Sequence, residues 1–151
     1  MIGKINLGNA IFAYPGVQSY HPSPEPWFAD NEGGPVVDMG PYYITALVML
    51  LGPVKTVTSK SKKVFLERVI GIGPRKGKKF KVECDTTYVS TLEFKNNSLI
   101  QMTLSFDVKD HKRNHIELYG DKGSIVVPDP NMFGGSAFTC LELGGEWTEH
   151  K

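Results

Sequence analysis

The run GGPVVDMGPYYITALVMLLGPV, residues 33–54, decides how the rest of the sequence is interpreted. One Gly-Pro pair opens an apolar segment within it, and a second Gly-Pro pair closes that segment. Proline is tolerated in the first turn of a helix, because its missing N–H would be unpaired there anyway, and glycine fits the left-handed position that ends a helix. The run therefore predicts a helix that begins with Pro41 and ends before Gly52, with a single carboxylate, Asp38, just before it.

The predicted helix is apolar on more than one side. Ile44, Leu47, Val48 and Leu51 follow the i, i+3, i+4, i+7 spacing of one helix face. The opposite face is apolar as well, and a helix that is apolar nearly all round is normally buried. We therefore expect this helix to be heavily buried.

After residue 54 the pattern changes to short strands separated by turns. KNNS (residues 95–98), DKG (121–123) and Gly144-Gly145 each predict a hairpin. Hairpins join antiparallel strands, and a further strand is predicted before Pro15. The sequence thus predicts an α+β fold: a large, mostly antiparallel open sheet with a helix layer on one face. Residues 17–35, rich in proline, glycine and aromatics, predict a long ordered loop, which in compact domains is often functional.

Composition excludes several classes of protein. A chain of 151 residues is long enough for one domain. Its 17 Lys and Arg against 16 Asp and Glu argue against a nucleic-acid partner, which needs an excess of basic groups. No segment approaches the roughly 18 uninterrupted apolar residues of a membrane span. The two cysteines, Cys84 and Cys140, lack metal-ligand spacing and indicate free thiols in the cytoplasm.

Two sequence features resemble a cofactor site and a metal site, but their spacing argues against both functions. GIGPRKG, residues 71–77, is one residue too long for a dinucleotide-binding loop and is followed by a predicted strand instead of a helix. His111 and His115 would lie about 13 Å apart on a strand, too far for one metal ion. We expect this chain to hold neither a cofactor nor a metal.

Asp38 has two interpretations. A negative charge before a helix N-terminus is stabilising by about 0.3–1 kcal/mol, so Asp38 is explained by a structural role alone. Tyr42 begins the helix four residues later, however, and an acid with a hydroxyl partner beside a cleft suits proton transfer to or from a substrate hydroxyl. His21, in YHPSPEPWF, lies among aromatic residues such as Trp27 that suit stacking on a sugar ring. It is a candidate for ligand contact, with an ordinary surface histidine as the alternative.

The helix run resembles the core motif in the C-terminal domain of Gfo/Idh/MocA oxidoreductases, the family of glucose–fructose oxidoreductase and inositol 2-dehydrogenase. The resemblance continues through YHPSPEPWF, STLEFKNNSLIQMTLSFDV, IELYGDKGSIVVPDPNMFGG and EWTEH, in order along nearly the whole chain. It implies that residues 1–151 form a single C-terminal domain, like that of dihydrodipicolinate reductase. Family members are two-domain enzymes whose N-terminal Rossmann domain, absent here, binds NAD or NADP.

The resemblance also implies site residues. Asp38 matches the catalytic aspartate of the family, but Tyr42 stands where a histidine is usual. Tyrosine is the poorer proton acceptor, because its reference pKa is about 10 against about 6.5 for histidine. Thr87 stands where one subfamily often has a histidine. Asp38 and Tyr42 are therefore our catalytic candidates, and His21, Trp27, Tyr43 and Thr87 are our substrate-binding candidates.

Two functions are consistent with these features. The first is the substrate-binding, catalytic-residue-bearing half of an NAD(P)-dependent dehydrogenase for a sugar, cyclitol or related polyol. This half would be inactive alone, would work with a Rossmann domain in cis, and would self-associate through the open sheet face. The alternative is a non-enzymatic binding or scaffold protein that keeps the sheet and lacks redox activity, as the replaced histidines suggest.

Overall fold

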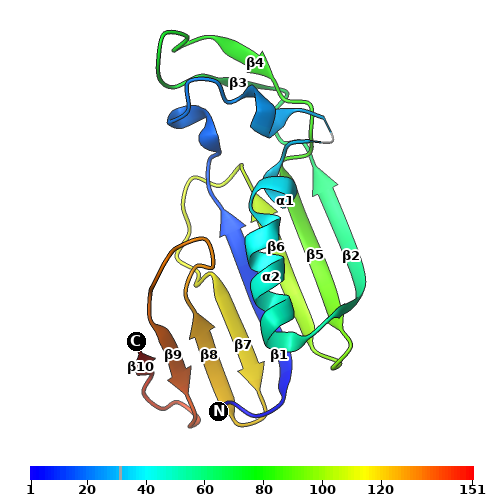
Figure 1. Cartoon of the computed structure of the whole chain (residues 1–151), viewed down its shortest axis with the longest axis vertical. Helices are drawn as coiled ribbons and strands as arrows, with labels where there is room; N and C mark the ends of the chain where they lie inside the picture. Colours follow the sequence, from blue (N-terminus) through cyan, green and yellow to red (C-terminus); the bar gives the residue numbers. More distant parts are fainter. Residues whose placement is uncertain (31) are drawn as a thin grey trace.

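The protein is built on one eight-stranded sheet, seen in a computed structural model that describes residues 1–30 and 32–151 (Figure 1). The strands of this sheet run in the order β10-β9-β8-β7-β1-β6-β5-β2. Their bounds are β1 Ile5–Ala13, β2 Val54–Lys62, β5 Thr87–Phe94, β6 Leu99–Ser105, β7 Ile116–Gly120, β8 Gly123–Val127, β9 Ala137–Cys140 and β10 Thr148–His150. A separate two-stranded hairpin consists of β3 Glu67–Val69 and β4 Lys79–Lys81.

The predicted fold class is confirmed, with one parallel pair inside the sheet. β1 pairs in parallel with β6, and all other neighbours in this sheet are antiparallel. Between these two strands the chain passes through the helices, β2, the β3–β4 hairpin and β5 before it enters β6 in the direction of β1. All three predicted hairpin turns join neighbouring antiparallel strands, and at KNNS the turn residue Asn97 adopts a positive φ of 69°.

Two helices form the layer on one face of the sheet (Figure 1). They are α1, Pro35–Asp38, and α2, Gly40–Leu51, so the main helix begins one residue before the predicted Pro41 and ends, as predicted, before Gly52. Proline lies in the first turn of each helix, and Gly52 ends α2 with a φ of 85°. The loop predicted over residues 17–35 contains two short 3-10 helices, η1 Val17–Ser19 and η2 Glu25–Phe28.

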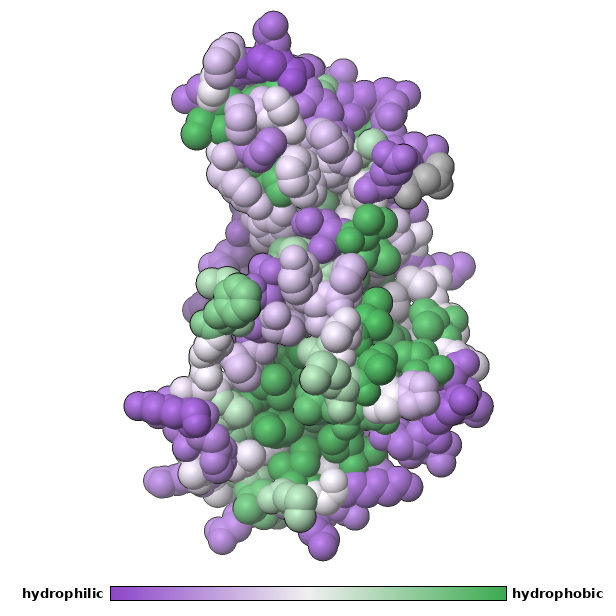
Figure 2. Space-filling view, viewed as in Figure 1, coloured by the Kyte–Doolittle hydropathy of each residue, from purple (hydrophilic) through white to green (hydrophobic). Residues whose placement is uncertain are grey.

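The buried face of α2 differs from the predicted one. Tyr43, Leu47 and Leu51 face the sheet and are buried, whereas Val48 is 37% exposed and Met49 is 82% exposed. The expectation that the helix is heavily buried is therefore wrong. A single helix layer covers one side only, and within the described residues no element packs over the outer side of α2. Figure 2 shows the resulting apolar surface in this view.

Two apolar clusters hold the fold together. The larger joins α2 to alternate residues of the central strands, among them Ile100, Met102 and Leu104 of β6. The smaller includes Phe28, Ile70 and Phe106, and it fixes the loop and the β3–β4 hairpin to one end of the sheet. Each fully buried large side chain of this kind contributes about 1.5–3 kcal/mol. The second cluster makes the long loop a fixed wall at the end of the sheet.

Candidate active site

A cavity of about 500 Å³ lies where the loop, the start of the helices and the segment after β8 meet. Its walls are largely aromatic and apolar, and a few polar groups interrupt them. The lining residues are Phe12, Tyr14, Val17, Tyr20, His21, Trp27, Asp38, Met39, Tyr42 and Asn131. Four of the six residues predicted from the sequence, Asp38, Tyr42, His21 and Trp27, are therefore brought together here.

Asp38 is the carboxylate of this cavity. It is the last residue of α1, and Met39, which follows it, caps the N-terminus of α2. The indole N–H of Trp27 donates a hydrogen bond to its Oδ1 at 3.2 Å. Burial raises the pKa of the Asp38 carboxyl, and the Trp27 hydrogen bond opposes that rise. A carboxyl whose pKa is raised beside a cavity is typical of acid–base catalysis.

Tyr42 lines the same cavity, but its hydroxyl is not the hydrogen-bond partner of Asp38. Its side chain is 48% exposed and also borders a neighbouring cavity of about 420 Å³ on the outer side of α2. Tyr42 thus stands at the border of the two cavities. From this position it can offer a hydrogen bond to a bound molecule.

His21 and Trp27 form an aromatic pair on the loop. Their ring centroids are 4.7 Å apart and the rings are tilted by 55°. His21 Nδ1 accepts the backbone N–H of Ser23 at 3.2 Å, so in the neutral ring Nε2 carries the proton. The pair therefore provides an apolar surface and an N–H donor in one wall of the cavity.

Tyr43 and Thr87, the other two predicted substrate-binding residues, do not line this cavity. Tyr43 is fully buried, and its hydroxyl contacts His115 Nδ1 at 2.6 Å and Asp129 Oδ1 at 3.0 Å. The Thr87 hydroxyl donates to Asp107 Oδ2 at 2.6 Å, beneath the loop. Both hydroxyls are engaged within the protein in this structure.

Six lining residues were not predicted from the sequence: Phe12, Tyr14, Val17, Tyr20, Met39 and Asn131. The Tyr14 and Tyr20 hydroxyls are 3.3 Å apart, and burial raises the pKa of Tyr14. The density of aromatics around Pro15 was a usable signal for the tyrosines. For Asn131 the only signal was its place in the polar, glycine-bearing loop of residues 128–135, whose composition favours a simple chain reversal over a place at the rim of a site.

The described residues contain no cluster of three His, Cys, Asp or Glu side chains suited to a metal ion. The distance argument for His111 and His115 is nevertheless wrong: both precede β7 in a loop, and their rings are 6.0 Å apart. The glycine-rich loop 71–77 joins β3 to β4, so no helix N-terminus follows it to bind a phosphate. Residues 1–30 and 32–151 thus offer no dinucleotide site of this kind. No helix among them is long and apolar enough to cross a membrane.

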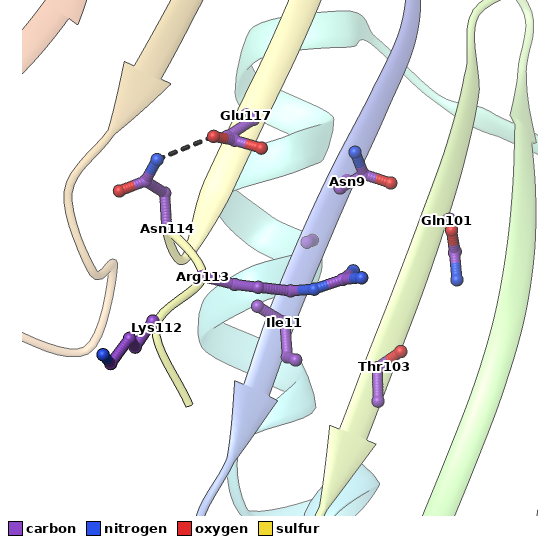
Figure 3. A pocket seen from close by; sticks show the side chains of 9 residues that line it. Asn9, Ile11, Gln101, Thr103, Lys112, Arg113, Asn114 and Glu117 are labelled. Carbon is purple, nitrogen blue, oxygen red and sulfur yellow. Dashed lines mark hydrogen bonds between the residues drawn. The ribbon is translucent and has the colours of Figure 1, made fainter. Parts of the chain in front are cut away.

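A third cavity, of about 370 Å³, lies on the sheet face opposite α2 (Figure 3). Arg113 lies across β1 there, and Asn114 donates a hydrogen bond to Glu117 at 2.6 Å (Figure 3). Glu117 also accepts a hydrogen bond from the Tyr119 hydroxyl at 2.8 Å. This face is polar and charged, in contrast to the aromatic cavity around Asp38.

The sequence pattern described as the GFO/IDH/MocA C-terminal domain matches residues 1–126. The chain belongs to this family. A comparison with curated proteins finds no match. The family assignment confirms the resemblance inferred from the helix run and its neighbouring motifs.

Solved structures share the fold at low sequence identity. Levoglucosan dehydrogenase in its apo form has a TM-score of 0.74 and 19% identity, over 99% of this chain and 41% of that one. Aldose-aldose oxidoreductase from Caulobacter crescentus, complexed with glycerol, has a TM-score of 0.67 and 18% identity, over 99% and 40%. An oxidoreductase from Agrobacterium radiobacter, in complex with NAD+, L-tartaric acid and magnesium, has a TM-score of 0.66 and 18% identity, over 99% and 38%. The chain thus spans about two fifths of the length of these proteins.

Proposed function

We propose that this chain is the substrate-binding and catalytic domain of an NAD(P)-dependent dehydrogenase that acts on a sugar, cyclitol or related polyol. The observation that carries the proposal is the half-buried Asp38 carboxyl in an aromatic-lined cavity with His21, Trp27 and Tyr42. Aromatic walls suit the C–H faces of a sugar ring, and the few polar groups suit its hydroxyls. Levoglucosan dehydrogenase and aldose-aldose oxidoreductase, which share the fold, have names consistent with this substrate class.

The chain's own part in the reaction is to bind the polyol and to move a proton. Asp38, when ionised, accepts the proton of the hydroxyl on the carbon that is oxidised. The raised pKa of its carboxyl makes it a better proton acceptor than an ordinary aspartate. Tyr42 and His21 hold neighbouring hydroxyls by hydrogen bonds. The hydride acceptor is NAD or NADP, which a separate Rossmann domain would hold, because the glycine-rich loop 71–77 leads into a strand and not into a helix N-terminus.

The outer side of α2 is the surface we assign to that Rossmann domain in cis. It exposes Met49 and, beside it, the cavity lined by Pro41, Tyr42, Thr45, Ala46, Met49 and Pro130. An apolar surface of this kind, next to the proposed active site, favours a second domain over solvent. The two free cysteines, Cys84 and Cys140, suit the cytoplasm as the location of the whole protein.

The alternative of a non-enzymatic binding or scaffold protein rests on Tyr42. Without help a tyrosine is a poor proton acceptor at neutral pH, so a chain that has lost the histidine could bind polyols without oxidising them. The two functions share the cavity and differ in whether a cofactor is reduced.

The test is to fuse the chain behind a family Rossmann domain and to follow formation of reduced nicotinamide with levoglucosan, D-glucose, D-xylose and myo-inositol. We expect turnover of at least one of these polyols. The chain alone should not change the fluorescence of NADH or NADPH. If the fusion binds NADH normally and reduces cofactor with none of the polyols, while the chain still binds one of them, the scaffold function is supported instead.

We also propose that the chain self-associates through the sheet face opposite α2. Side chains alternate along a strand, so Leu99 and Gln101 of β6 point away from the buried Ile100 and Met102. Leu99 is 46% exposed on that face, and Leu7 of β1 lies directly opposite it in the register. Charges of both signs, on Arg113 and Glu117, allow the face to meet a copy of itself.

Light scattering on two variants that each introduce a charge should show which face of the molecule mediates self-association. Leu99→Glu puts a carboxylate on the open sheet face and should convert a dimer or larger assembly of this chain to monomer. Met49→Glu, the same change at a more exposed position on the outer side of α2, should leave the assembly intact. If Met49→Glu dissociates the chain and Leu99→Glu does not, self-association uses the helix face.

A further inference from the structure

The loop between β8 and β9, residues 128–135, forms part of the rim of the Asp38 cavity. Asn131 lines that cavity, and Pro130 lines the neighbouring one on α2. The loop ends in Gly134 and Gly135, both with positive φ, and its tip residues are exposed. Because the loop contains glycines and its tip is exposed, Asn131 keeps one position only if its backbone is anchored to the rest of the protein.

Asp129 provides that anchor. Its Oδ1 accepts a hydrogen bond from the buried Tyr43 hydroxyl at 3.0 Å, and the same oxygen accepts the backbone N–H of Asn131 at 3.0 Å. The Asp129 carbonyl accepts the backbone N–H of Met132 at 3.1 Å. One carboxylate oxygen therefore links the core side of α2 directly to the backbone of Asn131.

His115 completes the anchor. Tyr43 has one hydroxyl proton, and it donates that proton to Asp129 Oδ1. The contact of 2.6 Å between Tyr43 and His115 Nδ1 then requires Nδ1–H to donate to the tyrosine oxygen. His115 Nε2 lies 3.9 Å from Asp129 Oδ2. The tyrosine is thus held on both sides, which fixes the direction of its bond to Asp129.

Within residues 1–30 and 32–151, Asn131 carries the one carboxamide that lines the cavity. None of the hydrogen bonds found across residues 1–30 and 32–151 uses its side chain, so both its C=O and its NH2 are available to a ligand. A carboxamide offers a donor and an acceptor side by side, which matches two adjacent hydroxyls of a polyol. Because the backbone of Asn131 is anchored, little conformational entropy is lost when its carboxamide binds a ligand.

We propose that Asn131 determines specificity by hydrogen-bonding substrate hydroxyls, and that Asp129, held by Tyr43 and His115, is the positioning residue that fixes it. The substrate part rests on the proposed function, whereas the positioning part rests only on the geometry of the chain. The two parts are therefore tested by separate measurements.

Amide hydrogen exchange on the chain itself tests the positioning. Asp129→Ala should speed exchange at Asn131 by about tenfold, as expected when a hydrogen bond of about 1.4 kcal/mol is lost. Asp129→Asn keeps an oxygen acceptor and should retain most of the protection. Asp121→Ala is the matched control, because Asp121 also accepts a backbone N–H, from Lys4, in the β7–β8 turn at the other end of the sheet (Figure 1). Unchanged exchange in Asp129→Ala overturns the positioning role.

Kinetics of the fused protein test the specificity. The substrate is whichever of levoglucosan, D-glucose, D-xylose and myo-inositol gives the highest kcat/KM. With it, Asn131→Ala should raise KM by about tenfold and leave kcat within about twofold. The reason is that the change removes a binding contact but no proton acceptor. Asp129→Ala should raise KM similarly, and the double variant should be no worse than Asn131→Ala. Additive effects of the two changes, or an unchanged KM in Asn131→Ala, overturn the proposal.

A binding measurement separates this inference from the proposed function. If the fusion turns over no polyol, the proposed function fails, and the chain alone is titrated with levoglucosan and with myo-inositol. A shift of the Asn131 side-chain amide resonance, larger than that of the Asn114 amide on the opposite face, supports the binding role. The absence of such a shift with either probe overturns it.

Discussion

Asp38→Asn in the fused protein should lower kcat by two to four orders of magnitude, the usual range for loss of a general base. The carboxamide keeps the size of the side chain and an oxygen for the Trp27 N–H, so the cavity keeps its shape. What is lost is the ability to accept the hydroxyl proton. The effect is measured by steady-state kinetics at a pH where Asp38 is ionised, with the tested polyol that gives the highest kcat/KM.

The same substitution should not lower stability, and this separates a catalytic residue from a structural brace. Burial raises the pKa of Asp38 in the folded state, so folding favours its protonated form. That contribution is present at low pH and is lost as the pH rises through the folded-state pKa. At pH 7 the uncharged carboxamide of the variant avoids the burial of an ionised carboxyl, and the thermal midpoint of the variant should match or exceed that of the original chain. A large fall in the midpoint, with normal activity per folded molecule, would make Asp38 a brace.

The pH profile provides an internal check on the role of Asp38. Trp27→Phe keeps an aromatic ring but removes the hydrogen bond that lowers the pKa of Asp38, so that pKa should rise further. The acid limb of kcat/KM should therefore move to higher pH. Trp147→Phe is the matched control, because Trp147 lies beside Phe138 and Glu117, away from the Asp38 cavity. An acid limb that moves equally in both variants would contradict a general-base role for Asp38.

Local rules were sufficient for most of the helices and strands and for four of the ten residues that line the cavity. The Gly-Pro pairs mark the ends of α2, and the turn residues mark the hairpins, because these depend on backbone conformation within a few residues. Asp38, His21 and Trp27 were found because they lie near one another in sequence and the loop folds back on itself. The family resemblance added the identity of the site, which the spacing of residues alone left open.

The sequence could not predict which residues far apart along the chain contact one another in the fold. The burial of Tyr43, not Ile44 or Val48, depends on which face of α2 meets β6, and the apolar pattern on both faces does not decide this. Tyr43 and Thr87 meet their partners Asp129 and Asp107 across 86 and 20 residues. No local pattern predicts those pairs, so a buried hydroxyl held within the protein could not be distinguished from one that faces a ligand.

The Asp107 carboxylate, which accepts the Thr87 hydroxyl, belongs to the most buried ion pair found within residues 1–30 and 32–151. Arg68 of β3 forms a salt bridge with Asp107, and the two side chains are only 7% and 6% exposed. Arg68 also donates to the carbonyls of Pro15 at 2.6 Å and Phe106 at 2.8 Å. Because Pro15 lies at the start of the loop, this guanidinium joins the loop, the hairpin and the end of β6 in one network.

Arg68→Ala should lower the free energy of unfolding by about 3–5 kcal/mol, because it leaves Asp107 buried without its counter-charge. The loss is a large part of the roughly 5–15 kcal/mol that is typical of a domain, and urea unfolding measures it. Lys79→Ala is the control on the same hairpin: its salt bridge with Glu67 is well exposed, so the cost should stay below about 1 kcal/mol.

The double variant Arg68→Met, Asp107→Leu distinguishes two explanations of this loss. Either the ion pair itself stabilises the fold, or the loss comes only from the buried charge that is left without its partner. Removing both charges leaves no unpaired ion, and buried pairs replaced by apolar residues of similar volume are often neutral or more stable. We expect the double variant to recover most of the stability lost in Arg68→Ala, but not the hydrogen bond to the Pro15 carbonyl. Amide exchange in the loop should therefore stay faster than in the original chain even where global stability returns. Full protection of the loop in the double variant would show that the apolar cluster of Phe28, Ile70 and Phe106 holds it without Arg68.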